Sequence, residues 1–283
     1  MAADRGASPW RKLPRLWVIQ ARLDLIWVLR DVKMFLMWTF ADSVMTVAGV
    51  TAMWLLSERF GGIGHWTRLQ VLFLLGYGAV VTGIVDTFFG FNVSYISRRV
   101  GRGQLDHTLI IPQPVWVSLL TEGFVPFSGS AILLPGAALL TWATHRLHLV
   151  SVPGWLALLA LNLGSSVLVL LAFQYGWGSL AFWAPRAAEE ISSSTMQLMT
   201  QLVKYPLDGL GAGLTGGLLS VLPVGFLAWF PCRALLGQAK GLEWVTPVAA
   251  LGFALAASWV WRKGTRHYGR VGSQRYSGRG FRS

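Results

Sequence analysis

The chain alternates long apolar runs with short polar segments. A helix that crosses a bilayer needs about 20 mainly apolar residues to cover the hydrocarbon core. Five runs are compatible with this length, and together they predict an all-α, polytopic membrane protein. They lie at about residues 35–56, 69–93, 115–143, 154–182 and 243–261.

The region 183–242 is less regular and supports two predictions for one further crossing helix. Residues 207–231 are apolar but rich in glycine and proline, so they form either this helix or a re-entrant segment. Residues 184–204 are amphipathic, and they form either an interfacial cytoplasmic helix or a crossing helix whose polar face lines the bundle interior. That face is a candidate lining of a transport pathway, and it consists of Glu190, Ser194, Gln197 and Gln201.

The N-terminal segment has a pattern of its own. In residues 10–32, apolar residues recur at helical spacing while Arg15 and Arg22 point elsewhere. Such a segment suits an amphipathic helix in the cytoplasmic interface, although it also fits an extension of the first crossing helix. The predicted organisation is a cytoplasmic N-terminus with this helix (1–34), a transmembrane domain (35–262) and a basic cytoplasmic tail (263–283).

Composition supports the membrane assignment. The 283 residues are 54% hydrophobic and 13% charged, with a mean hydropathy of +0.52. A soluble domain carries about a quarter charged residues because it must present a wetted surface. This chain carries only 13% charged residues, so most of its surface must face lipid.

Positive charges are distributed unevenly between the two sides of the predicted bundle. Lys and Arg concentrate at the cytoplasmic ends of membrane helices. Seven precede the first apolar run, seven follow the last, and Arg98, Arg99 and Arg102 lie between the second and third. The distribution predicts six crossings with both termini in the cytoplasm. It also accounts for the net charge of +12 by topology and contact with membrane lipids, without a nucleic-acid partner.

Two acidic residues, Asp42 and Asp86, lie inside strong apolar runs. Charged side chains in a span are costly and tend to face protein or a watery cavity. Asp86 shares a helix face with small residues such as Gly83, and Asp42 shares one with Gly49. Small residues let helices approach closely in lipid. We therefore expect both acids on helix-packing faces. They either face each other, or they are unrelated and snorkel or pair with Arg98 or Arg99.

Motifs for common catalytic chemistry are absent from the sequence. It contains no GxxxxGK[ST] phosphate loop, no HExxH and no GxSxG. His145 and His148 have no obvious third metal ligand, and the single Cys232 excludes an intramolecular disulfide. We expect no catalytic residue, no metal site and no cofactor in this chain.

Several segments resemble those of ABC-2 type exporter permeases, the transmembrane subunits of ABC transporters. The connection Ile96–Pro112 is similar to the "I…G.LD..L..P" segment between the second and third spans of that family, and Phe182-Trp183 matches the FW that closes their fourth span. The resemblance covers nearly the whole chain, and its later motifs look most like a bacterial subgroup often encoded as two different permeases beside one ATPase. These motifs are Tyr205-Pro206-Leu207, Pro223–Phe226, Pro231 and Leu235–Gly237.

The resemblance implies a bacterial inner-membrane protein with six spans, the fifth near 186–206, and a re-entrant segment at 207–237. It implies that ATP and Mg²⁺ are bound by a separate ATPase dimer, and that a second permease copy or a paralogue completes the pathway. The cytoplasmic connection after the second span would contact that ATPase. Its candidate coupling residues are Arg98, Arg99, Gly101, Gly103, Gln104, Leu105 and Asp106.

Two other classes of protein remain as alternatives. A membrane-embedded enzyme acting on a lipid-linked substrate would need histidines near Asp42 and Asp86, and no histidine lies in a predicted span at their depth. A proton-coupled secondary transporter could use the same two acids, but such proteins typically contain inverted repeats, which are not evident here.

Overall fold

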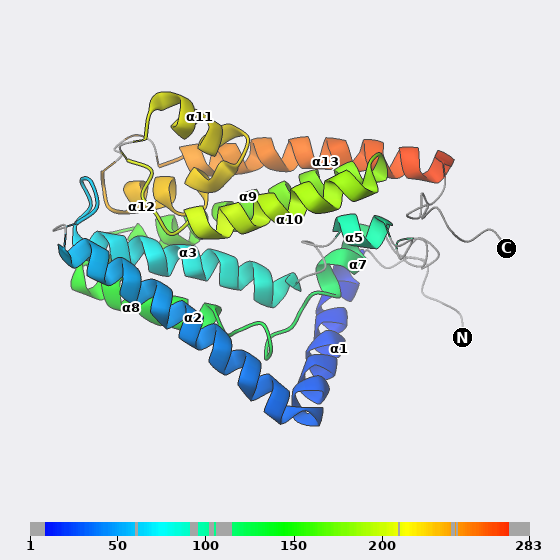
Figure 1. Cartoon of the computed structure of the whole chain (residues 1–283), viewed down its shortest axis with the longest axis horizontal. Coiled ribbons are helices and arrows are strands. Elements are labelled where there is room, and N and C mark those ends of the chain that lie inside the picture. Colours follow the sequence, from blue (N-terminus) through cyan, green and yellow to red (C-terminus); the bar gives the residue numbers. More distant parts are fainter. Residues whose placement is uncertain are drawn as a thin grey trace.

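The structure is a computed structural model that describes residues 9–59, 62–90, 96–101, 105, 115–208, 210–238, 241 and 243–271. These residues are mainly helical and form no β-strand; a single bridge pairs Ile63 with Trp66. The prediction of an all-α protein is confirmed. Figure 1 shows the helices, most of which run along the long axis of the molecule.

Four helices are long and apolar enough to cross a membrane, and they match the first, second, fourth and last predicted spans. At about 1.5 Å per residue, the shortest of them measures about 32 Å. The last one continues beyond its predicted end at residue 261, so the first part of the predicted tail is helical. The four are α2 (Val32–Arg59), α3 (Arg68–Phe88), α9 (Trp155–Ser179) and α13 (Val245–Val271).

The third predicted span was wrong as a continuous helix over 115–143. The chain forms α7 (Val115–Thr121) and α8 (Leu133–Arg146), and residues 122–132 between them are turns and bends. The sequence Glu-Gly-Phe-Val-Pro-Phe-Ser-Gly-Ser explains the break, because glycine, proline and serine favour turns over helix. Helix α8 alone is 14 residues, or about 21 Å, long.

The region 183–242 contains one straight helix followed by a bent segment. Helix α10 (Pro185–Leu202) begins with a proline, whose missing N–H is tolerated in a first helical turn, and it packs along α9. The apolar part that follows consists of α11 (Ala212–Ser220), the 3-10 turn η3 (Pro223–Phe226) and α12 (Trp229–Leu235), with a bend of 66° between its two halves. In Figure 1, α11 and α12 lie at one end of the molecule, and the C-terminal end of α13 lies at the other.

The first two helices meet at a sharp turn. Helix α1 (Pro9–Arg30) and α2 diverge as a V in Figure 1, with the turn at Asp31. The side chain of Asp31 accepts a hydrogen bond from the backbone N–H of Met34 (3.1 Å), which caps the start of α2. Helix α1 is therefore not a straight extension of α2; its place in the membrane interface stays a prediction.

A buried carboxylate holds α1 to the segment between α7 and α8. Asp24, which is 7% exposed, accepts hydrogen bonds from the backbone N–H groups of Phe127 (2.8 Å) and Ser128 (3.2 Å) and from the Ser128 hydroxyl (2.6 Å). Close by, the Trp17 ring packs on Phe124 with 5.6 Å between ring centroids. Since buried charges require such partners, this contact fixes α1 in one position.

Helix α3 is the centre of the structure, and small residues let α8 approach it closely. A Cβ atom on Gly76 would lie 2.7 Å from the backbone nitrogen of Leu140, and one on Gly83 would lie 2.6 Å from the Cα of Leu133. Such contact requires glycine, as in other close helix pairs in lipid. The predicted helix-packing role is confirmed for the small residues on the Asp86 face of α3. It is not seen on the Asp42 face of α2, where Asp42 is exposed and a Cβ on Gly49 would meet nothing within 4 Å.

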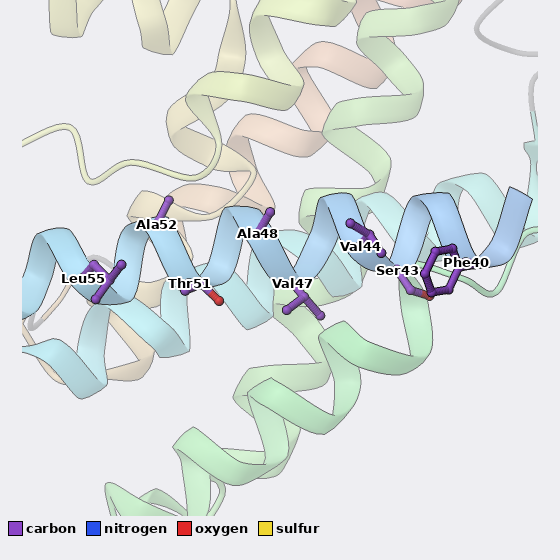
Figure 2. A pocket seen from close by; sticks show the side chains of 8 residues that line it. All are labelled: Phe40, Ser43, Val44, Val47, Ala48, Thr51, Ala52 and Leu55. Atoms are coloured by element: carbon purple, nitrogen blue, oxygen red, sulfur yellow. The ribbon is translucent and has the colours of Figure 1, made fainter.

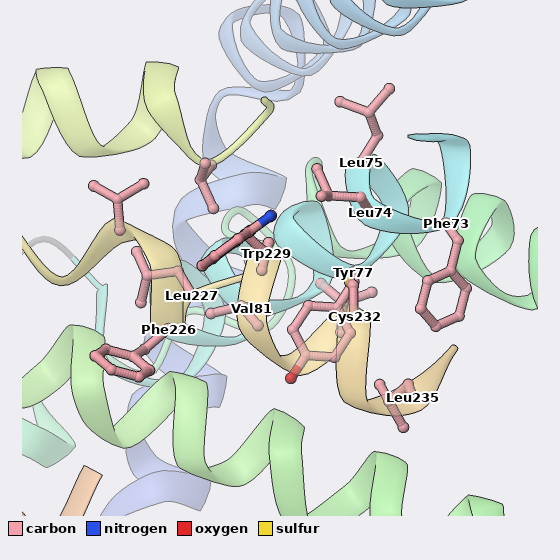
Figure 3. Close-up of a cluster of buried hydrophobic side chains, with 14 of the residues drawn as sticks. Phe73, Leu74, Leu75, Tyr77, Val81, Phe226, Leu227, Trp229, Cys232 and Leu235 are labelled. Carbon is pink, nitrogen blue, oxygen red and sulfur yellow. The ribbon is translucent and has the colours of Figure 1, made fainter. Parts of the chain in front are cut away.

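The bent segment 223–235 is part of the same core. Figure 3 shows Tyr77 and its neighbours on α3 packed against Phe226, Trp229 and Cys232. The Tyr77 hydroxyl is 3.0 Å from Oγ of Ser166. The Ser166 hydroxyl in turn donates a hydrogen bond to the backbone carbonyl of Phe226 (2.9 Å). The segment is therefore bound to both α3 and α9.

A second acid binds α12 of this segment. Asp208 accepts hydrogen bonds from the indole N–H groups of Trp66 and, at 2.7 Å, of Trp229. Trp66 belongs to the connection between α2 and α3, so Asp208 joins that connection to α12 at one end of the molecule.

Candidate pathway and coupling site

A short helix follows the second span at the other end of the molecule. Helix α5 (Ile96–Gly101) packs against α10 and against the 3-10 turn η2 (Leu180–Phe182). Ile96 fits against Gly178, where a Cβ atom would lie only 2.9 Å from the Cβ of Ile96. A separate hydrophobic cluster, here called the junction cluster, forms around it: Ile96, Val100, Leu105, Leu119, Ala181, Phe182, Ala188 and Tyr268.

Two ion pairs fix α5 to its neighbours. Nε of Arg98 is 2.8 Å from Oε1 of Glu189, which lies on α10. Nη1 of Arg99 is 2.9 Å from Oε2 of Glu122, which follows α7. The two predicted coupling arginines are therefore bound to two different parts of the bundle.

The other predicted coupling residues have mixed outcomes. Leu105 is 1% exposed and belongs to the junction cluster, and Gly101 is the last residue of α5. Gly103, Gln104 and Asp106 lie outside the residues that the structure describes. Their coupling role stays a prediction.

Asp42 and Asp86 line one cavity of about 270 Å³ between α2 and α3. Because side chains four residues apart share a helix face, Thr46 follows Asp42 along α2, and Thr82 precedes Asp86 along α3. The two acids thus face the same space. Arg98 and Arg99 form their ion pairs with glutamates, as described above.

The end of α10 closes this cavity with further polar groups. Thr200 and Lys204 both line it, and Lys204 is half-buried. Apolar side chains such as Leu75 and Ile132 complete the wall. The cavity therefore combines two acids, a cation and three threonine hydroxyls. Asp86 and Lys204 are partly buried, whereas Asp42 is exposed on α2.

A second, smaller cavity of about 220 Å³ lies between α5 and α10. The Arg98–Glu189 ion pair lines it, together with Ser192 and Gln197. Thr200 lines both cavities. Polar groups therefore extend from the junction at α5 to the acids between α2 and α3.

The predicted polar face of α10 lies on the outside of the single chain. Glu190, Ser194, Gln197 and Gln201 are all exposed, and Gln197 also lines the smaller cavity. The face does not turn into the bundle of this chain. If α10 crosses the membrane, this face needs a polar neighbour other than lipid.

Helix α2 is also largely uncovered. Of its described residues, Met53 and Ser57 are buried. Figure 2 shows side chains on α2 that line a mainly apolar pocket. It is lined by Phe40, Ser43, Val44, Val47, Ala48, Thr51, Ala52 and Leu55.

Sequence reasoning missed three residues of these sites. Glu189 and Glu122 pair with the coupling arginines, and Lys204 lines the acidic cavity. Glu189 is adjacent to the predicted Glu190, but the 3.6-residue period placed it off the polar face. Lys204 directly precedes the Tyr205-Pro206-Leu207 motif, and this position next to a family motif is the feature of the sequence that could have indicated it.

The described residues contain no group of three or more His, Cys, Asp and Glu side chains that could hold a metal ion. His145 ends up in the last turn of α8, and His148 follows it in a left-handed conformation with φ of 54°.

The fold and the site define an integral membrane protein of several apolar helices, with a polar cavity in its bundle and a compact junction at one end. Residues 43–272 match the family model described as ABC-2 family transporter protein, and the chain belongs to this family. It is thus a permease, a membrane subunit for transport rather than an enzyme. Comparison with curated proteins and with solved structures finds no match.

Proposed function

We propose that the chain is the permease subunit of an ATP-binding-cassette exporter that forms the translocation pathway and is driven by a separate ATPase. The family match over 43–272 carries this proposal. The sequence has no phosphate loop of its own, so ATP and Mg²⁺ would be bound by the partner, two copies of which would act as a dimer.

In the proposed topology the chain crosses a bacterial inner membrane six times, with both termini in the cytoplasm. The crossings are α2, α3, the broken pair α7 and α8, α9, α10 and α13, and the bent segment 212–235 re-enters from the outer face. Helix α10 supports this arrangement because its 18 residues extend about 27 Å, close to the thickness of the hydrocarbon core.

The junction at α5 would transmit the force of the ATPase to the pathway. Residues 98–106 would contact the ATPase, and the Arg98–Glu189 pair would pass their movement to α10. The Arg99–Glu122 pair would pass it to the segment after α7. Both pairs begin on α5, so one displaced helix would act on two crossings.

The pathway itself would run beside α2, α3 and α10. The exposed polar face of α10 and the cavity of Asp42 and Asp86 support this placement. A second permease, either another copy or a paralogue, would cover the polar face and complete the pathway. This gives Glu190, Ser194, Gln197 and Gln201 a wet environment in the membrane.

The test is to purify the tagged full-length chain from its native membranes in mild detergent, identify stoichiometric partners by mass spectrometry and measure ATP hydrolysis. We expect a Walker-type ATPase at one copy per permease, with hydrolysis that depends on Mg²⁺. Purification of the chain with no ATPase and no hydrolysis would overturn the proposal.

Topology is tested separately with single cysteines. In a Cys232→Ser background, Ala2→Cys and Ser283→Cys place one thiol near each terminus, and a membrane-impermeant maleimide is added to intact cells. We expect both thiols to be protected until the membrane is permeabilised. Labelling of either thiol in intact cells would contradict the cytoplasmic termini.

A proton-coupled transporter stays a second candidate because Asp42 and Asp86 share one cavity with Lys204. The two candidates differ in their energy source. Transport that survives loss of the ATPase and stops on collapse of the proton gradient would favour this second candidate, and the reverse result would favour the exporter.

A further inference from the structure

A groove of about 500 Å³ runs between α9 and α13, along residues 168–175 of α9 and 254–265 of α13. Both helices are candidate membrane spans by length and composition. Its floor is formed by alanines, of which Ala172 is 6% and Ala257 is 7% exposed. Leu168, Leu171 and Ala254 extend the apolar wall.

One end of the groove carries a cation. Arg262 lines it, next to the half-buried Trp261. The adjacent Lys263 points elsewhere, because its Nζ lies 3.9 Å from the centroid of the Trp259 ring. Two neighbouring cations therefore differ in one respect: Arg262 belongs to the groove, whereas Lys263 does not.

A buried hydroxyl lies in the wall at the same level. The ring of Tyr175 lines the groove edge-on to Trp261, with 5.5 Å between ring centroids. Its Oη atom is buried and has no hydrogen-bond partner among the described residues. Buried hydroxyls normally find a partner, so this donor would pair with an acceptor oxygen in the groove once Trp261 moved aside to expose it.

We propose that this groove binds an anionic phospholipid, with an acyl chain along the alanine floor and the phosphate at Arg262. The guanidinium fork binds phosphate through two parallel N–H···O bonds, which an ammonium group does not provide. An ester oxygen of the same lipid would accept a hydrogen bond from Tyr175.

The composition of the groove favours a lipid over a protein partner. A phospholipid supplies a chain for the apolar floor and an anion for Arg262 in one molecule, at the depth where α13 leaves the predicted hydrocarbon zone. The leaflet follows from the proposed orientation and would be the cytoplasmic one. The binding itself does not depend on transport or on an ATPase.

Native mass spectrometry of the full chain in detergent tests the proposal, with phosphatidylglycerol and phosphatidylcholine of matched acyl chains added in turn. We expect phosphatidylglycerol to be retained preferentially. Arg262→Ala should lower its retention about fivefold, as expected for one cation near an anionic headgroup. Lys263→Ala removes the same charge beside the groove and should leave retention close to that of the unmodified chain.

A second variant separates the groove from the general attraction of the basic helix end. Ala254→Phe keeps every charge but fills the groove from its wall, and it should release phosphatidylglycerol to a similar extent as Arg262→Ala. Equal loss in the Arg262 and Lys263 variants, equal retention of both lipids, or full retention in Ala254→Phe would each overturn the proposal. Monodispersity on size exclusion shows that each variant is folded.

Discussion

Arg98 of α5 and Glu189 of α10 form an ion pair with Nε and Oε1 2.8 Å apart. The side chains are 42% and 28% exposed, and pairs this accessible contribute only about 0–1 kcal/mol to stability. The pair also lines the cavity between the two helices. Its position therefore suits it to link the movements of α5 and α10 more than to stabilise the fold.

The first prediction concerns this link. Arg98→Glu places two acids opposite each other, and we expect it to abolish stimulation of the partner ATPase while the complex still assembles. The reciprocal change Glu189→Arg should have the same effect. The double variant restores an attractive pair and should regain most of the coupling. ATP hydrolysis by the purified complex, compared with that of the ATPase alone, is the measurement.

The outcome against this prediction is specific. If the double variant is no better coupled than either single one, the pair does not transmit movement and each charge acts alone. Arg68→Glu is the matched control, because Arg68 pairs with Glu58 at 3.6 Å at the other end of the span. It should leave coupling intact.

The second prediction concerns the attachment of α1. Asp24→Ala leaves the two backbone N–H groups at Phe127 and Ser128 without their carboxylate acceptor. Hydrogen bonds to a charged group contribute about 1.5–3 kcal/mol each, with partial additivity, so we expect α1 to detach. Limited proteolysis should cut the variant within 9–30 much faster than the unmodified protein. Asp31→Ala removes only an exposed helix cap and should change the rate little; equal protection in the Asp24 variant would contradict the attachment.

The sequence predicted the membrane helices well where a long, continuous apolar run was present. Length and apolarity alone located α2, α3, α9 and α13. Each helix that crosses the hydrocarbon core must be apolar over about 20 residues and must satisfy its backbone hydrogen bonds internally. The stripe through Gly83 was predicted to pack against a helix for the same physical reason. Its partner, α8, could not be predicted, because the sequence of one helix does not determine which neighbour it touches.

The errors arose where tertiary contacts outweigh hydropathy. Residues 122–132 lie in a predicted span, but Gly90 and Gly123 touch so closely that a Cβ on Gly90 would be 2.4 Å from the carbonyl oxygen of Gly123. That contact and the Asp24 hydrogen bonds stabilise a non-helical path. Leu105, a predicted coupling residue, is buried in the junction cluster, and its coupling role stays a prediction. Its replacement by alanine would cost about 2–5 kcal/mol and perturb the fold as well as coupling.

The third prediction concerns Asp208 and the bent segment. Asp208→Ala removes the shared acceptor of the Trp66 and Trp229 indoles, so we expect α12 to loosen from the connection between α2 and α3. Hydrogen exchange at 223–235 should accelerate at least several-fold. Glu243→Ala is a control because, among the residues that the structure describes, Glu243 accepts an exposed backbone hydrogen bond from Gly241 (3.2 Å) and contacts neither indole. Unchanged exchange in the Asp208 variant would mean that packing alone holds the segment.

The last prediction tests the close packing of α3 on α8. In Gly83→Ala the new methyl group would meet Leu133 at 2.6 Å from its Cα and 2.7 Å from its backbone nitrogen, and backbone atoms cannot rotate away. The helices must separate, at a cost of about 1–3 kcal/mol, and the apparent melting temperature in detergent should fall by several degrees. Gly252→Ala on α13 makes the same change where nothing lies within 4 Å, and alanine is the better helix former. That variant should melt no lower than the unmodified protein, and equal melting of the two variants would show that α3 and α8 are not in close contact at Gly83.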